Sequence, residues 1–355
     1  MRLSSVEVIP YALPFKEPYV TARGALERRE MVLLRVRDED GVVGLGEAVP
    51  LSLRGGATLA QVVRELEAWA EAQEDEGLSA PALCAVATAK ADLLGRRTGS
   101  GGVPEDEAVA CNATLVAGEP RAVAAAAERW AADGFTTFKL KLGAESVKSP
   151  LEEEFSQTRG ADVEQVRAVR EAVGPGARIR VDVNAAWDVE TARQRLGELE
   201  PYGIELAEQP VATLEEMAEL AEATSIPLAA DESVASLAEA ERAAALGACA
   251  YTGIKLSKVG GPEAALAIAD VLPAFITSAL DGPVGIAAGA QVALSLAETT
   301  HPERLHLAHG LATQRLFAET IASVECELRD GMLHLPPGPG LGVEIDEDAL
   351  QAHRL

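Results

Sequence analysis

Basic side chains are few for a chain of this size. The 355 residues include 31 lysines and arginines against 56 aspartates and glutamates, which gives a formal net charge of −25. No basic run interrupts this excess. An acidic surface repels nucleic acid and anionic lipid, so we expect neither as a partner. An anionic small molecule would need a local cationic pocket made by lysines and a metal ion.

Cysteine is also scarce and shows no metal-binding spacing. The four residues are Cys84, Cys111, Cys249 and Cys326, with no CxxC pair. This usage is typical of buried, reduced thiols in a cytosolic protein and argues against disulfides or structural zinc.

Long apolar runs and leader signals are missing as well. No stretch approaches the roughly 20 apolar residues of a membrane span, and Met1–Pro10 alternates like a strand, without the apolar centre of a signal peptide. We therefore expect a cytoplasmic protein. The glycine-rich segment Gly99–Pro104 is not followed by Gly-Lys-Ser/Thr, which excludes a phosphate-binding loop there.

The first hundred residues have the pattern of an α+β unit. Strands are predicted at Ser5–Ala12, Met31–Arg37 and Val42–Glu47, and helices at Leu59–Ala72 and Ala82–Gly95.

From about residue 110 the chain alternates short strands with helical segments, which is typical of a parallel sheet enclosed by helices. A barrel of this kind needs ~250 residues and leaves roughly 100 for a second unit. Gly143–Gly160 is predicted to be an inserted surface loop. Eight strands are predicted, near Ala110–Thr114, Thr137–Leu142, Ile179–Val183, Ile204–Ala207, Pro227–Ala230, Tyr251–Leu256, Ala274–Ser278 and His306–Ala308.

After the eighth strand, Val324–Leu328 and Met332–Leu335 resemble a hairpin, and the tail beyond it is predicted to return to the N-terminal unit. The fold class is therefore α/β, a modified (β/α)8 or (β/α)7β TIM-type barrel with an α+β capping domain. We expect the cap to comprise 1–108, completed by 324–355, and the barrel 109–323.

Charged residues recur where the predicted strands end. Asp182, Glu208, Asp231 and Lys255 follow one another at intervals of 26, 23 and 24 residues, which is the length of one strand and one helix. Because the carboxyl ends of parallel barrel strands share one rim, these side chains should converge there. Three carboxylates would bind a hard divalent cation such as Mg²⁺, and the same oxygen ligands would serve Mn²⁺.

Two lysines precede this series. Lys139 and Lys141 lie on one strand and should point to the same side, because side chains alternate along a strand. A second ammonium and a metal ion both disfavour protonation, so one of these lysines could act as a base near neutral pH. Lys255 would face Lys141 across the barrel mouth.

These motifs resemble those of the enolase superfamily, in particular its muconate-lactonising subgroup, over essentially the whole chain. The residues that carry the resemblance are Lys139-Leu140-Lys141, Asp182-Val183-Asn184, Glu208-Gln209-Pro210, Asp231-Glu232-Ser233 and Ile254–Gly261. Each string is weak alone, but five in order at this spacing are specific.

The resemblance implies roles for these residues. Asp182, Glu208 and Asp231 would bind Mg²⁺, Lys141 would remove a proton α to a carboxylate, and the metal would hold the resulting enediolate. Lys255 would be the second acid/base or electrostatic lysine, with Lys139 tuning its neighbour. The cap would close over the barrel through Phe15–Arg29 and Ala48–Gly56.

Within the subgroup, Thr277–Gly289 and His309–Thr313 look most like o-succinylbenzoate synthases, dehydratases of menaquinone biosynthesis. Gly282 and Gly285 open a predicted helix and would offer backbone N–H groups to a substrate carboxylate, next to Ser278. An Asp-x-Asp typical of dipeptide epimerases is missing, because that place reads Ala308-His309-Gly310.

Other residues favour other members of the subgroup. Tyr19–Gly24, with Tyr19 and Arg23 as candidate substrate contacts, is more similar to epimerases and N-acylamino acid racemases. The alternatives are therefore such a racemase or epimerase, a muconate-type cycloisomerase, and a non-catalytic barrel that binds metal or a carboxylate.

Several polar residues have two interpretations. Asn184 is either a support for the metal site or a turn-former, and Glu232 either supports a lysine or forms a structural ion pair. Lys258 is predicted to be a solvated rim charge, and His309 more often structural than substrate-binding. The expected partner is a small carboxylate, and the sequence leaves a homo-oligomer open.

Overall fold

A computed structural model describes residues 2–21, 24–52, 55–104, 106–116, 118–143, 161–297 and 307–355. The insertion predicted at 143–160 lies outside these ranges except for Gly143, as do Arg23 and His306. No helix within the described ranges is long and apolar enough to cross a membrane.

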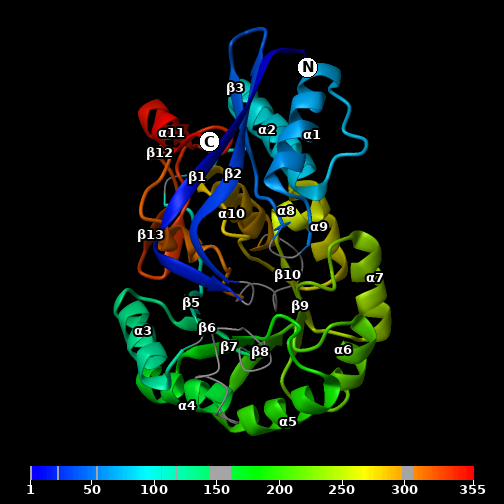
Figure 1. Ribbon diagram of the computed structural model, residues 1–355, viewed down its shortest axis with the longest axis vertical. Coiled ribbons are helices and arrows are strands. Elements are labelled where there is room, and N and C mark those ends of the chain that lie inside the picture. The colour runs from blue at the N-terminus through cyan, green and yellow to red at the C-terminus, as the bar shows by residue number, and fades with distance from the viewer. Residues whose placement is uncertain are drawn as a thin grey trace.

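The N-terminal unit is a three-stranded antiparallel sheet covered by two helices (Figure 1). Its strands are β1 (Leu3–Thr21), β2 (Gly24–Asp38) and β3 (Val43–Ala48), and the helices are α1 (Leu59–Ala72) and α2 (Ala80–Thr98). The meander and both helices were predicted, but β1 and β2 extend well beyond the predicted residues. They form one long hairpin, because their backbones pair up to Pro14 and, after an irregularity, again from Tyr19 to Thr21.

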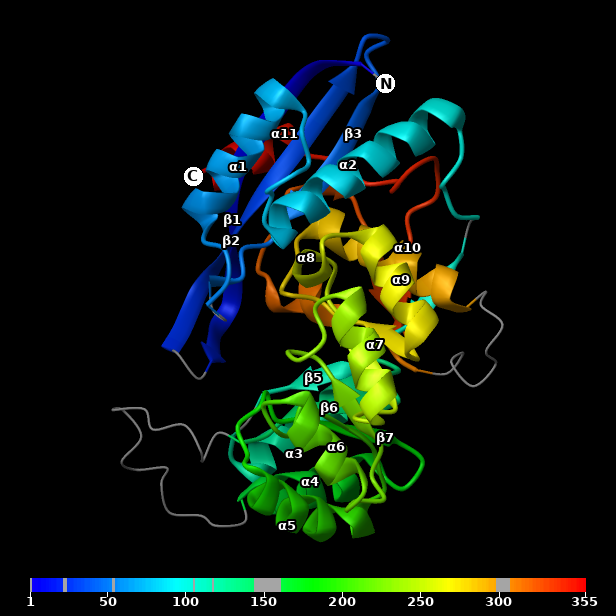
Figure 2. The ribbon, with the colours of Figure 1, turned by 90° about the vertical axis from the view of Figure 1, so that its right-hand side faces the viewer.

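This sheet is buried on both faces. Val32, Leu34 and Val36 of β2 pack on α1 and α2, whereas Met31 and Leu33 join the large core that continues into the rest of the protein. Alternate residues of a strand face opposite sides, so one strand serves both cores. The sheet therefore contributes one face to the core beneath α1 and α2 and the other face to the large core; Figure 2 shows the cap above the barrel, with α2 next to the barrel helices α8 and α9.

The larger unit is a parallel sheet with strands in sequence order. Its strands are β5 (Ala113–Leu115), β6 (Thr137–Lys141), β7 (Arg178–Asp182), β8 (Ile204–Glu208), β9 (Leu228–Ala230), β10 (Tyr251–Ile254) and β11 (Ala274–Ile276). The helices that follow are α3 (Pro120–Ala132), α4 (Ala161–Val173), α5 (Val189–Leu199), α6 (Leu214–Ala221), α7 (Leu237–Leu246), α8 (Leu256–Val259), α9 (Pro262–Val271) and α10 (Pro283–Ala297).

A two-residue segment closes this sheet into a ring. His309 bridges to Cys111 and Gly310 to Thr277, both in parallel. The His309 N–H donates to the Ala110 carbonyl at 2.7 Å and the Gly310 N–H to the Ile276 carbonyl at 2.8 Å. The eighth strand was predicted at His306–Ala308, which is too early. The residues that pair, His309 and Gly310, come directly after that segment. The modified TIM-type barrel itself is confirmed.

Side-chain caps start several barrel helices. Asp188 accepts a hydrogen bond from the Thr191 N–H before α5 and Ser236 one from the Glu239 N–H before α7. Thr213 and Glu216 form a reciprocal capping box before α6. Caps of this kind satisfy backbone N–H groups that lack a partner in the first turn, and so fix where each strand-to-helix loop ends.

The C-terminal segment forms short strands and a final helix. The hairpin β13 (Glu327–Arg329) and β14 (Met332–His334) pairs with β4 (Ala108–Ala110). Strand β12 (Ala322–Val324) pairs with β15 (Glu344–Ile345), and α11 (Glu347–His353) lies beside β1. The contacts of the chain end with β1, where Arg354 bridges to Tyr11 and the Leu355 N–H donates to the Pro10 carbonyl at 3.0 Å, support our proposal that 324–355 completes the cap formed by 1–108, around a barrel at 109–323.

Candidate active site

Two carboxylates and a lysine form a row across three neighbouring strands. Lys141 ends β6 opposite Asp182, which ends β7 and in turn stands opposite Glu208 at the end of β8. Asp231 follows β9 directly. All three carboxylate residues are fully buried. The convergence expected from their spacing is therefore present in the fold.

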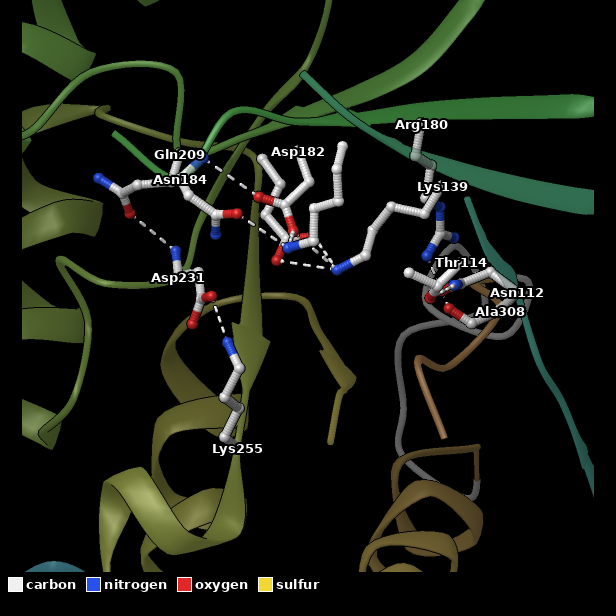
Figure 3. A network of polar contacts seen from close by, with 12 residues as sticks. Asn112, Thr114, Lys139, Arg180, Asp182, Asn184, Gln209, Asp231, Lys255 and Ala308 are labelled. Atoms are coloured by element: carbon white, nitrogen blue, oxygen red, sulfur yellow. Dashed lines mark hydrogen bonds and ion pairs between the residues drawn. The ribbon is translucent and has the colours of Figure 1, made fainter. Parts of the chain in front are cut away.

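Both lysines of β6 contact these carboxylates. Lys139 Nζ lies 3.0 Å from Asp182 Oδ2 and 3.1 Å from Glu208 Oε2, and Lys141 Nζ lies 2.5 Å from Asp182 Oδ2 (Figure 3). The two side chains point the same way, as their alternation predicted. Lys139 is almost wholly buried, whereas the Lys141 side chain remains 23% exposed, so only Lys141 can meet a ligand in the barrel mouth.

Asp231 is held from the other side by two more lysines. Its carboxylate contacts Lys255 Nζ, as Figure 3 shows, and lies 2.9 Å from Lys258 Nζ. The prediction that Lys258 is a solvated rim charge was wrong, because its side chain is 10% exposed and directed at Asp231. Lys255 precedes α8, so one turn of that helix brings Lys258 back toward the same carboxylate.

The backbone is left-handed after two strands. Asn184 has a φ of 51°, which asparagine tolerates, and Gln209 has a φ of 39°, which a glutamine adopts only when its surroundings enforce it. The Asn184 side chain accepts a hydrogen bond from Lys141 at 2.9 Å and donates one to Glu232 at 3.1 Å. Asn184 is thus both a turn-former and a support for Lys141, and Glu232 supports it indirectly.

Gln209 has the corresponding role for Asp231. Its Oε1 accepts hydrogen bonds from the Asp231 N–H at 2.9 Å and from the Ser233 hydroxyl at 3.0 Å. Its Nε2 donates to the Val211 carbonyl at 2.8 Å. The positive φ turns this side chain toward the loop after β9, and the buried amide then fixes the position of the Asp231 backbone.

The charges at the site shift one another's titration. Burial alone would lower the pKa of Lys139, but Asp182 and Glu208 outweigh it and hold that pKa above its ordinary value. Burial would raise the pKa of Asp182, but Lys139 and Lys141 hold it well below its ordinary value. For Glu208, burial and the Asp182 charge together raise the pKa. Lys139 is thus a cation shared by Asp182 and Glu208.

The three carboxylates suit a hard divalent cation in their chemistry. They offer only oxygen ligands, they are buried, and they lie on successive strands. In the described ranges no three histidine, cysteine, aspartate or glutamate side chains are arranged to hold a metal ion. Their oxygens instead face lysine nitrogens, so binding a cation would require Lys139 and Lys255 to withdraw from them.

A buried arginine lies deeper in the barrel. Arg180 stands opposite Lys139 in the ladder and contacts Glu205 at 2.5 Å and the Ala308 carbonyl at 2.6 Å. Its guanidinium lies 5.1 Å from the Phe275 ring centre. Burial and this cation lower the pKa of His309 to about 3. The neutral His309 ring accepts a hydrogen bond from the Ile276 N–H, which favours its structural interpretation.

The remaining predicted contacts are placed as follows. Tyr19 stacks on Phe15 with ring centres 5.5 Å apart, near the tip of the long hairpin. Ser278 is buried and donates to Asp281 Oδ2 at 2.6 Å. Gly285 lies in the first turn of α10, next to Glu47 of the cap. Arg23 falls outside the described residues.

The two cap segments expected to close over the barrel face each other across a cleft. This cleft measures about 290 Å³ and is lined by residues 26–30 on one side and by Pro50, Ser52 and Leu59 on the other. Arg29 connects it to the barrel by donating to the Pro50 carbonyl at 2.7 Å and the Ala279 carbonyl at 3.1 Å.

Comparison with known proteins agrees with this geometry. The model of the enolase C-terminal domain-like family matches residues 121–349, and the mandelate racemase/muconate lactonizing enzyme N-terminal domain matches residues 4–73. An o-succinylbenzoate synthase of Thermobifida fusca is 39% identical over 215 residues, covering 60% of this chain and 62% of that protein. This match therefore spans less than two thirds of the relative.

Two other relatives match nearly the whole chain. Muconate cycloisomerase 1 of Pseudomonas putida is 30% identical, covering 97% of this chain and 96% of that protein. The structure of a dipeptide epimerase from Cytophaga hutchinsonii, complexed with Mg and the dipeptide D-Ala-L-Val, is 26% identical with a TM-score of 0.86. It covers 99% of this chain and 98% of that one. The chain belongs to the mandelate racemase/muconate lactonizing enzyme family of the enolase superfamily.

Proposed function

We propose that this protein is an o-succinylbenzoate synthase-type dehydratase that uses Mg²⁺ and acts on a small carboxylate. The observation that carries the proposal is the set of three buried carboxylates on consecutive strands, with lysines on both sides. The 39% identity to a named synthase favours this reaction within the family. We place the protein in the cytoplasm.

Asp182, Glu208 and Asp231 would hold the cation. Mg²⁺ at this position would supply positive charge where negative charge develops on the substrate carboxylate. The cation would also replace lysine nitrogens as the counter-charge of the acids and so release these side chains toward the substrate. Mn²⁺ fits the same oxygen ligands.

Lys141 would be the base that removes the α-proton. It is more exposed than Lys139 and is oriented by Asn184. Lys139, on the same strand, is the cation shared by Asp182 and Glu208 in this structure and lies beside the proposed base. Lys255, on the Asp231 side, would stabilise the anion by its charge while hydroxide leaves.

The same geometry favours one rival reaction. Lys141 and Lys255 approach the acids from different strands, so one could remove a proton and the other return it, as racemisation of an N-acylamino acid or epimerisation of a dipeptide requires. A cycloisomerase of the muconate type and a non-catalytic carboxylate-binding barrel are the remaining alternatives.

The test is a direct assay with and without the cation. Conversion of 2-succinyl-6-hydroxy-2,4-cyclohexadiene-1-carboxylate to o-succinylbenzoate is followed by absorbance with Mg²⁺ and with EDTA, and N-succinyl amino acids are followed by polarimetry. We expect rapid dehydration that EDTA abolishes. Racemisation without dehydration would transfer the function to the rival, and no turnover of any substrate would refute both.

A further inference from the structure

Glu47 of β3 points toward the barrel, on the face of the strand opposite Gly44 and Gly46. A Cβ on Gly46 would lie 1.9 Å from the Ala85 carbonyl oxygen and one on Gly44 2.3 Å from that of Ala89, so this face of β3 lies directly against α2. Glu47 is one residue further and therefore faces the opposite side. Its side chain is almost fully buried at 2% exposure.

The carboxylate of Glu47 occupies the start of barrel helix α10. One oxygen accepts a hydrogen bond from the Gly282 N–H at 2.7 Å, and Gly285 supplies a second backbone N–H. The other oxygen accepts a hydrogen bond from the Tyr11 hydroxyl at 2.8 Å. A hydrogen-bond acceptor at this helix end is favourable, because the first-turn N–H groups have no partner within the helix.

The glycines of this turn are explained by this contact. A Cβ on Gly282 would lie 2.2 Å from the Tyr11 hydroxyl, and one on Gly285 would lie 2.7 Å from Glu47 Oε1. The Gly282 and Gly285 N–H groups, which we predicted to bind a substrate carboxylate, thus bind a carboxyl group of the protein itself in this structure.

The turn continues from Glu47 to the candidate site through Asp281. Asp281 accepts hydrogen bonds from the Ser278 hydroxyl at 2.6 Å and from the Ala279 N–H at 2.7 Å. It also accepts one from the Ser257 hydroxyl at 3.3 Å. Ser257 lies in α8, two residues after Lys255. The hydrogen bonds of Glu47 with Gly282 and of Asp281, the residue before Gly282, with Ser257 therefore connect a cap strand to the helix that follows Lys255.

The electrostatic surroundings of Glu47 are mixed. Tyr11 of β1, Cys84 of α2 and Asp281 of the barrel turn face it, and Arg29 of β2 is the cation that interacts with both Glu47 and Asp281. Backbone N–H groups, more than ion pairs, therefore hold this carboxylate in place.

We propose that Glu47 is a positioning residue. Through it the cap fixes the turn 278–282 and, by way of Asp281 and Ser257, the start of α8, the helix that directly follows Lys255. The catalytic part of this inference rests on the proposed function. The structural part does not depend on any substrate.

The test compares Glu47→Ala and Glu47→Gln with Asp92→Asn. Asp92 is a matched control, because it is an equally buried cap carboxylate that binds the Leu45 and Leu341 N–H groups and not the barrel turn. Hydrogen–deuterium exchange is measured on the peptide covering 278–286. In Glu47→Ala we expect exchange about tenfold faster there, because the hydrogen bonds that Glu47 accepts from this turn are lost. Glu47→Gln retains one acceptor and should be intermediate.

Kinetics on whichever substrate the wild type converts complete the test. We expect kcat in Glu47→Ala to fall about tenfold with a smaller change in KM, partial recovery in Glu47→Gln, and no such split in Asp92→Asn. Exchange in 278–286 equal to that of Asp92→Asn would overturn the structural link. Faster exchange with unchanged kcat would overturn the link to Lys255. A wild type that converts no substrate would refute the proposed function, while the exchange result would still decide the structural link.

Discussion

The protonation of Glu47 should make the stability of this protein fall as the pH rises. Burial and the nearby Asp281 raise the pKa of Glu47 to about 8 from an ordinary value of 4.5. Between these values the folded protein retains a proton that the unfolded chain has released. Stability from this residue is thus fully present below pH 4.5 and is lost as the pH rises toward 8.

The size of the loss follows from the shift. Each pKa unit corresponds to about 1.4 kcal/mol, so the wild type should lose about 2 to 3 kcal/mol of unfolding free energy from this residue between pH 6 and pH 9. Glu47→Gln cannot titrate, yet its amide can accept from the Gly282 N–H and donate to Tyr11. Burial raises the pKa of Cys84 to about 12 and that of Tyr11 further above its usual range, so neither neighbour contributes in this interval.

The assay is urea unfolding of both proteins at pH 6, 7, 8 and 9. Taking the difference between the two cancels every other titrating group, and Glu128→Gln, on an exposed helix surface, is the control for loss of a surface charge. We expect the variant to gain about 2 to 3 kcal/mol relative to wild type across this interval. A difference that stays constant within about 0.5 kcal/mol would refute the reasoning, because additive errors are of that size.

Three further predictions concern single residues. Lys141→Ala should lower kcat by about 10² to 10⁴ without loss of fold, and an unchanged rate on every substrate of the panel would remove Lys141 as the base. Lys139→Met leaves Asp182 and Glu208 without their shared cation and should lower the free energy of unfolding in urea by about 3 to 5 kcal/mol. Added Mg²⁺ should restore part of this free energy, and no recovery would argue against a cation site. Gly282→Ala places a Cβ against Tyr11 and should cost about 1 to 3 kcal/mol, whereas Gly197→Ala, which meets nothing within 4 Å, should be neutral or stabilising.

The sequence pattern predicted those helices and strands that are determined by neighbouring residues in the chain. Helix α1 has the predicted bounds, and the strand ends bearing Lys141, Asp182 and Glu208 follow from alternation and the barrel repeat. The eighth strand was misplaced because only two residues pair there, too few to leave a periodic signal.

The sequence could not reveal contacts between distant segments. Lys258 was interpreted as exposed because no local pattern shows which way a four-residue helix turns. The N–H groups of the glycine turn at 282–285 were predicted to bind a substrate carboxylate, and this stays a prediction. In this structure the turn binds the side chain of Glu47, 235 residues earlier. Only the packing of the cap on the barrel brings that residue to the turn.

The closure of the barrel has a consequence for where the ring tolerates change. The ladder is continuous from β5 to β11, but among the residues that the structure describes its closure depends on bridges at His309 and Gly310. The acids and lysines come from β6 to β10, the uninterrupted arc opposite this seam. Substitutions near His309 and Gly310 should therefore change the closure of the ring without changing the spacing of the charged groups, because that spacing is set by the pairing of β6 to β10.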